Sequence, residues 1–180
     1  MTAAEDMRRR RRRGNTILFS KDGEYLIPLS DYLNTMDRRA VVIWALGLAD
    51  DAAKELSTRK PQEERPARAI EAAWLWAGGR EKMSLARRFI LDCHAAAHDM
   101  IDPADVALCH AIGQACSVVH TTKHALGFPL YDLTATALSA GDCDIDKLLD
   151  AKLSLYFDRA VAAVRALTSY QGDWAPFMNK

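Results

Sequence analysis

The stretch from Asp102 to Leu126 constrains the fold most, because on a single helix it has two different faces. At about 100° per residue, one face is apolar and the other carries small and polar side chains, including three of the five histidines. The apolar face consists of Leu108, Ala111, Ile112, Ala115, Val118, Val119, Thr122 and Leu126, and the opposite face of Val106, His110, Gly113, Ser117, His120 and His124. We therefore predict a central helix that is covered on both sides, and whose second face is either a buried polar network or a site.

The composition agrees with a helical fold. The chain of 180 residues is long enough to bury roughly two-thirds of its unfolded surface in one core. Alanine occurs 30 times, whereas Gly occurs 9 times and Pro 6 times, and this balance favours closely packed helices. We predict an all-α protein, a helical bundle of about six helices, with a short β-hairpin near the N-terminus.

The expected elements can be placed from apolar spacing, N-caps and helix breakers. Asp37 and Asp102 are suitable N-caps, and Pro66 suits the first turn of a helix. The expected helices span residues 37–57, 66–77, 84–101, 102–126 and 131–139, with a long final helix after residue 144. The β-hairpin is expected over residues 16–29, where β-prone segments flank the turn signal Lys21-Asp22-Gly23.

Charge is distributed unevenly along the chain, although the formal net charge is zero. The run Arg8–Arg13 repels itself, so we expect residues 1–14 to form a disordered arm and residues 15–180 a single helical domain. From Asn15 onward, 18 basic and 22 acidic side chains leave the body at −4. An arginine arm can contact nucleic acid, but no basic patch interleaved with aromatic residues accompanies it. Nucleic acid is therefore an alternative partner and not the expected one.

The cysteines and the apolar runs exclude several classes of protein. The four cysteines form no CxxC pair and follow no secretory leader, so we expect reduced thiols and neither a disulfide framework nor a zinc cage. The longest apolar runs fall far short of the roughly 20 residues that cross a bilayer. We expect a cytoplasmic protein without membrane contact and without a cofactor.

The sequence contains no catalytic signature, and its histidines offer only a weak indication of chemistry. Neither a nucleophile elbow nor a phosphate loop is present. Two pairs have the i, i+4 spacing that can present two imidazoles to one metal ion, His94 with His98 and His120 with His124. No Glu lies between the members of either pair as in an HExxH motif, and Arg87 shares the stripe of the first pair, where it would repel a cation. A metal-binding helical protein with a histidine-lined groove stays an alternative.

Four side chains lie off the predicted core stripes and are candidates for contact with a partner. Trp76 points away from the core stripe of its helix, so it needs a second neighbour, either another part of the chain or a partner protein. Arg87, His94 and His98 share a stripe of the next helix that differs from its apolar stripe. Residues 171–180 are too apolar for a solvated tail, and we expect them to dock on the bundle or on a partner.

Three segments of the chain carry a family resemblance. They are RPARAIEAAWLWAGG from Arg65 to Gly79, SLARRFILDCHAAAHD from Ser84 to Asp99, and ADVALCHAIGQACSVVHTTKHALGFPLYDL from Ala104 to Leu133. Their most specific elements are Arg65-Pro66 leading into Ala69-Ile70-Glu71-Ala72, the Trp before Ala77-Gly78, the run His94-Ala95-Ala96-Ala97, and His120 with His124-Ala125-Leu126. Over roughly residues 38–138 the chain resembles the immunity proteins of bacterial polymorphic toxin systems, in a small helical family related to the fifth immunity class.

The resemblance implies an all-helical cytoplasmic protein that has no catalytic activity and that binds and neutralises a cognate protein toxin. The off-core side chains would then face the partner, namely Trp76, Arg87, His94 and His98. A polar seam shared by the fold would comprise Arg65, Glu71, His110, His120 and His124. A mildly acidic body would suit a basic toxin surface, since complementary charge speeds association. Alanine-rich helices with an off-core Trp also allow a homodimer.

Overall fold

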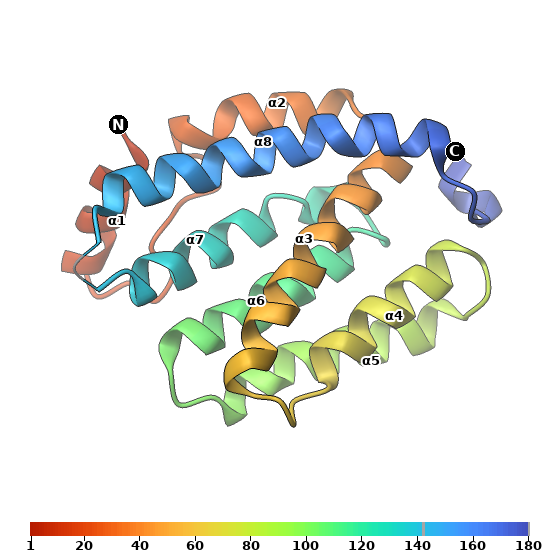
Figure 1. Cartoon of the computed structure of the whole chain (residues 1–180), viewed down its shortest axis with the longest axis horizontal. Coiled ribbons are helices and arrows are strands. Elements are labelled where there is room, and N and C mark those ends of the chain that lie inside the picture. The colour runs from red at the N-terminus through yellow and green to blue at the C-terminus, as the bar shows by residue number, and fades with distance from the viewer. Residues whose placement is uncertain (142, 180) are drawn as a thin grey trace.

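The structure of the chain, a computed structural model, describes residues 1–141 and 143–179 (Figure 1). These residues form α-helices and short 3₁₀ helices, and none of them forms a strand. The eight α-helices are α1 (Ala3–Arg12), α2 (Ile27–Thr35), α3 (Arg38–Arg59), α4 (Arg65–Ala77), α5 (Met83–Ala96), α6 (Pro103–Ser117), α7 (Gly127–Ser139) and α8 (Ile145–Ser169). The 3₁₀ helices are η1 (Glu24–Leu26), η2 (Ala97–Asp99), η3 (Thr122–His124) and η4 (Pro176–Asn179). The all-α prediction is confirmed, with more helices than expected.

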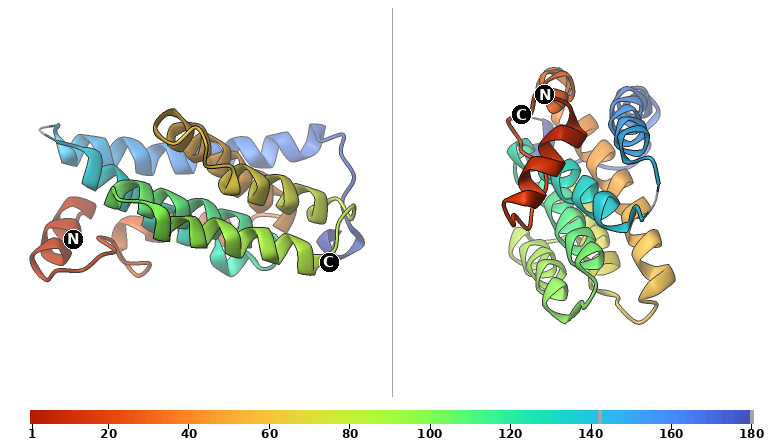
Figure 2. Two further views of the ribbon diagram at one scale, coloured as in Figure 1. Left: turned by 90° about the horizontal axis from the view of Figure 1, so that it is seen from below. Right: turned by 90° about the vertical axis from the view of Figure 1, so that its left-hand side faces the viewer.

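Helix α6 is the central element of the bundle, because it contacts α3, α4, α5 and α7. Helices α4 and α5 form an antiparallel pair on one side of it, and α8 runs along the long axis of the molecule (Figure 1). Helix α3 passes between α8 and the α4–α5 pair. It contacts α8, α6 and α4. The two termini lie at opposite ends of the long axis, as Figure 1 and the left view of Figure 2 both show.

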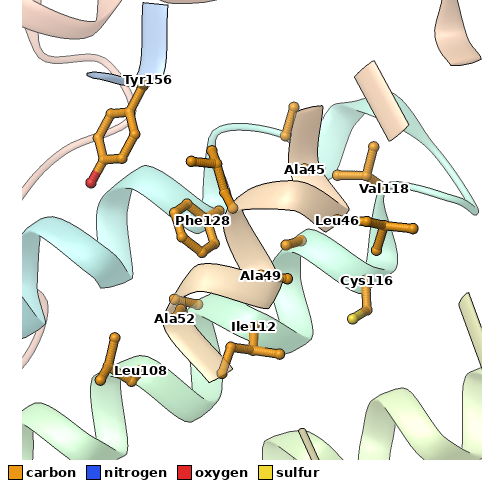
Figure 3. Close-up of a cluster of buried hydrophobic side chains, with 14 of the residues drawn as sticks. Ala45, Leu46, Ala49, Ala52, Leu108, Ile112, Cys116, Val118, Phe128 and Tyr156 are labelled. Atoms are coloured by element: carbon orange, nitrogen blue, oxygen red, sulfur yellow. The ribbon is translucent and has the colours of Figure 1, made fainter. Parts of the chain in front are cut away.

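The core between α3 and α6 is built on small residues that let the two backbones approach (Figure 3). Ala45, Ala49 and Ala52 of α3 are buried there, and larger side chains fill the space around them. These larger side chains are Leu46, Leu108, Ile112, Phe128 and Tyr156, which come from α3, α6, α7 and α8. Truncating such a buried Leu or Ile to Ala typically costs about 2–5 kcal/mol. The core therefore fixes the position of α6 on its apolar side.

Several helix ends lie where the sequence places them. The side chain of Asp37 accepts a hydrogen bond from the amide of Arg39 and caps α3, and Asp102 caps α6 by accepting from the amide of Ala104. Gly78 follows the last residue of α4. In the described part of the chain, no helix combines the length and the hydropathy that a bilayer crossing needs. Local capping chemistry is thus a sound guide to the boundaries of α3, α4 and α6.

The predicted β-hairpin over residues 16–29 is wrong. A turn forms at Lys21 and Asp22, but the second half of the segment becomes η1 and the start of α2. Pro28 lies in the first turn of α2, where its missing N–H and its fixed φ favour a helix. The amide of Leu18 donates to the hydroxyl of Thr134 on α7 (3.1 Å), so a tertiary contact replaces the expected strand pairing.

Residues 3–12 form helix α1, where the sequence led us to expect a disordered arm. Thr2 and Glu5 build a capping box: the Thr2 hydroxyl accepts from the Glu5 amide, and the Glu5 carboxylate accepts from the Thr2 amide. The arginines Arg9–Arg12 occupy the last turn, where positive charge interacts favourably with the helix dipole. The arginine run is thus part of an ordered helix.

A buried carboxylate explains how α1 tolerates its arginines. Asp6 is inaccessible to solvent and accepts hydrogen bonds from Arg9 (2.6 Å), from Arg10 (3.1 Å) and from the hydroxyl of Tyr25 (2.9 Å). Burial opposes ionisation of Asp6, but these hydrogen bonds and the charge of Arg10 together hold its pKa below the ordinary value. The negative charge offsets the repulsion between neighbouring guanidinium groups and joins α1 to η1.

The single helix predicted over residues 102–126 is wrong in its second half. Helix α6 ends at Ser117, a turn and η3 follow, and α7 already begins at Gly127. The hydroxyl of Ser117 donates to the carbonyl oxygen of Gly113 one turn earlier (2.8 Å). The expected two-faced helix is therefore present only as far as this serine.

A side chain from α3 accounts for the early end of α6. The guanidinium of Arg38 donates to the carbonyl oxygens of Val119 (2.8 Å) and His120 (3.2 Å). Carbonyls that would otherwise need the next helical turn are satisfied in this way. As a result, His120 and His124 do not share a helix face with His110.

Candidate functional site

The crossing of α5 and α6 brings His94 and His110 together. The Nδ1 atoms of the two rings lie 3.1 Å apart, and the His110 ring packs on Tyr131 of α7 with 5.2 Å between centroids. The His94 ring lies directly over Gly113, where a Cβ would come within 2.6 Å of its Cε1 and Nε2 atoms. The glycine thus leaves room for the His94 ring against α6.

Both rings of this pair are uncharged at neutral pH. Burial lowers the pKa of His94 to about 4, and positive charge on His110 and His124 would lower it further. Burial also lowers the pKa of His110, with a smaller contribution from His98. Since a neutral imidazole has one N–H, one Nδ1 of the pair donates and the other accepts.

The remaining two histidines of the α6–α7 region lie apart from this pair. Nδ1 of His124 lies 3.2 Å from Oε1 of Gln114, and the residue is exposed. The ring of His120 packs on Trp76 with 4.5 Å between centroids, and its buried Nε2 has no hydrogen-bond partner among the described residues. Burial lowers the pKa of His120. The structure therefore does not bring His120 and His124 together with His94 and His98 in one site.

Trp76 is covered by the chain's own C-terminal segment. The ring of Phe177 stacks on it with 4.6 Å between centroids, and the guanidinium of Arg38 lies 5.5 Å from the centre of the Phe177 ring. The amide of Ala175 donates to the carbonyl oxygen of Ala77 at the end of α4 (2.8 Å). Residues 171–180 were expected to dock on the bundle or on a partner, and the contacts of Ala175 and Phe177 show docking on the bundle. In this arrangement the Phe177 ring occupies the face of Trp76 that a partner would contact.

Other candidates on α5 and η2 lie at the surface. Arg87 and His98 are exposed, and His94 is half-buried. Leu91 lies one turn from each of Arg87 and His94 and is 55% exposed. Together Arg87, Leu91, His94 and His98 form what we call the α5 face.

The five residues expected to share a polar seam do not form one network. Arg65 pairs with Glu63 (2.5 Å) and with Asp99 after α5 (2.6 Å), so it ties the start of α4 to η2. Glu71 is exposed on α4. Of the expected seam, only His110 contributes to the α5–α6 crossing.

A cavity of about 510 Å³ adjoins the histidine pair, and sequence reasoning missed it. Ile17 of the N-terminal segment, Val106 of α6 and Leu138 of α7 provide apolar walls. His110 also lines it, so the α5–α6 crossing and the cavity share a side chain. The only sequence signal was Ile101, an apolar residue before the α6 cap that is 93% exposed at the rim.

The side chains that could carry chemistry do not converge. Burial raises the pKa of Cys93 and Cys116 well above the ordinary value and that of Cys109 to about 12, so these thiols stay protonated at neutral pH. Among the residues that the structure describes, no three His, Cys, Asp or Glu side chains are grouped to hold a metal ion.

Comparison with known proteins places the chain in a family. Residues 31–159 match the model of the family described as "Imm-5 like putative immunity protein". The chain belongs to this Imm-5 like family. No curated protein and no solved structure matched.

The Imm-5 like match covers most of the helices described above. It runs from α2 through α7 and into α8, and it includes Trp76, the α5 face and the His94–His110 pair. Helix α1 and the tail that covers Trp76 lie outside it. The cavity is composite, since α6 and α7 belong to the matched region whereas Arg11 and Ile17 do not.

Proposed function

We propose that this protein is an immunity protein that binds a cognate bacterial toxin and neutralises it without catalysis of its own. The observation that carries the proposal is the family match over residues 31–159. The surface of α5 supports it, because the exposed side chains of Arg87, Leu91 and His98 are available for contact with a partner.

We further propose that the α5 face contacts the toxin. The exposed Leu91 lies one helical turn from Arg87 on one side and from His94 on the other, with His98 further along in η2, so an apolar side chain has polar neighbours as in many interface centres. The low pKa of His94 keeps that ring neutral, so its burial at neutral pH carries no cost of removing a charge from water. Trp76 takes part in this proposal only if the tail moves away.

Charge suggests the kind of toxin surface that would fit. The chain from Asn15 onward carries −4, whereas α1 packs on α8 and brings the formal net charge of the molecule to zero. A basic toxin surface would therefore be attracted to the body away from α1 and from Arg87, and this attraction would raise the association rate more than the affinity. We expect association to slow as salt is added.

The test combines capture with protection. The tagged protein is used to isolate a stoichiometric partner from lysate of its own organism, and that partner is then expressed in a sensitive host with and without the protein. We expect the partner to be toxic alone and harmless in the presence of the protein. A partner whose toxicity persists in spite of binding, or the absence of any partner, would contradict the proposal.

Matched leucine variants locate the binding face. Leu91→Ala on α5 should weaken binding of the captured toxin by about 2 kcal/mol if this residue is an interface anchor. Leu155→Ala on α8 removes a similarly exposed leucine and should leave binding unchanged. Equal effects of the two variants would remove the α5 face from the proposal.

A further inference from the structure

The cavity between the N-terminal segment, α6 and α7 has the properties of a small-molecule site. Its volume of about 510 Å³ lies within the range of roughly 300–1,000 Å³ that is common for such sites. Ile17, Val106 and Leu138 give it apolar walls. Leu138 is 39% exposed and Ile101 at the rim is 93% exposed, so apolar surface continues from the interior to the mouth. The occupant should therefore be largely apolar.

The charge of the cavity is one-sided. Arg11 lines it, whereas no acidic residue does among the described residues that form its walls. The neighbouring arginines are occupied, since Arg8 pairs with Asp146, and both Arg9 and Arg10 pair with Asp6. An apolar ligand with one negative charge would complement this site.

Arg11 is held in place without being neutralised. Its Nη2 donates to the carbonyl oxygen of Ala137 on α7 (2.9 Å), and no carboxylate of the described residues pairs with it. A guanidinium has five N–H donors, so one neutral contact leaves others for a ligand. The planar fork of the group matches a carboxylate in a bidentate manner.

A second polar group reaches the cavity from α6. Because Nδ1 of His110 faces His94, the nitrogen of this ring that is left for the cavity is Nε2. The pKa of His110 is lowered by burial, so the ring is neutral at neutral pH. It can hydrogen-bond to a ligand without adding a second charge.

We infer that this cavity binds an amphipathic carboxylate, with the carboxylate on the guanidinium of Arg11 and an aliphatic chain along Ile17, Val106 and Leu138. Such a ligand places its carboxylate on the exposed guanidinium of Arg11, which no carboxylate of the described residues pairs with, and covers the apolar walls with its chain. The inference goes beyond toxin binding and does not depend on it.

The probe is decanoate, titrated into the full-length protein by calorimetry below the critical micelle concentration. We expect one saturable site, with affinity that rises by about fourfold for each added methylene group from octanoate to decanoate. Decan-1-ol has the same chain without the charge. Its affinity should be lower by about tenfold or more, because it lacks the charge-assisted contact. Absence of saturable decanoate binding, or equal binding of the alcohol, overturns the inference.

Matched variants test the two halves of the site. Arg11→Gln should weaken decanoate binding by about tenfold or more, whereas Arg12→Gln, one position further along α1, should have no effect. Val106→Phe should block the cavity, and circular dichroism with thermal unfolding shows whether each variant is folded. If folded Val106→Phe binds decanoate normally, the ligand lies elsewhere and the inference fails.

A second copy of the chain is the competing occupant. Sedimentation of the unliganded protein and of Val106→Phe distinguishes the two cases. If the protein is a dimer that Val106→Phe dissociates, a second copy fills the cavity and the inference is overturned. If the association state is unchanged by the variant while decanoate binding is lost, the carboxylate site is supported.

Discussion

The Nδ1 atoms of His94 and His110 face each other at 3.1 Å across the crossing of α5 and α6. The contact is a hydrogen bond only while one of the two nitrogens is without a proton, because two imidazolium rings would each present an N–H to the other. The pair also lies between two proposed sites: His94 belongs to the α5 face and His110 lines the cavity. Several measurable properties follow from this and from neighbouring contacts.

Acidification should destabilise the protein through His94. The pKa of this ring is about 4 in the folded protein because of burial, against an ordinary value of 6.5. Below pH 6.5 the unfolded chain therefore binds the proton first, and the free energy of unfolding falls as the pH decreases towards 4. Since the ring is only partly buried, we expect a loss of about 1 kcal/mol between neutral pH and about pH 5 in urea unfolding.

Two variants separate His94 from the other groups that titrate in this range. His94→Gln should flatten the dependence of the free energy of unfolding on pH, whereas His98→Gln, at an exposed position, should retain it. If the two variants have the same pH dependence, His94 is not the source.

Gly113→Ala should destabilise the fold by about 1–3 kcal/mol, because the new methyl group overlaps the His94 ring, which must then leave its position and give up its contact with His110. Gly47→Ala on α3 is the control, since a Cβ at that position meets no atom within 4 Å. The control should stabilise the helix by about 0.5–1 kcal/mol, so the two substitutions have opposite signs in chemical denaturation. Destabilisation by both would show that the contact with His94 is not the cause.

Asp6→Asn should loosen α1. It removes the buried negative charge that Arg9, Arg10 and Tyr25 share, and it leaves the guanidinium groups without a counter-charge. We expect trypsin to cleave at Arg8–Arg13 more readily in this variant than in the parent protein, as followed by mass spectrometry of the earliest fragments. Asp22→Asn, at an exposed turn position, should leave the cleavage rate unaltered.

Phe177→Ala should uncover Trp76. The substitution removes the stacked ring and the cation–π contact of Arg38, so we expect a loss of about 1–2 kcal/mol in the free energy of unfolding. Tryptophan emission should also shift to longer wavelength as water reaches the indole. Pro176→Ala, at an exposed neighbouring position, serves as the control. Unchanged emission in folded Phe177→Ala would mean that another group covers Trp76.

The helical class and several helix boundaries followed from the sequence alone. Asp37 and Asp102 cap α3 and α6, and α4 ends at Ala77, as predicted. These features depend on residues within one or two turns of each other, where capping and apolar spacing act directly. The family resemblance also rested on local segments, and the match over residues 31–159 confirms it.

Tertiary contacts decided the features for which the sequence was a poor guide. Arg38 takes up the carbonyl oxygens that follow α6, Asp6 with Tyr25 makes the arginine run helical, and Phe177 covers Trp76. The cavity likewise exists only because residues 11–18 lie beside α6 and α7. Each of these contacts joins residues that are distant along the chain. The spacing of apolar residues within one segment therefore does not predict them. The sequence thus determined which segments are helical, and the packing of distant side chains decided where α6 ends and which surfaces stay open.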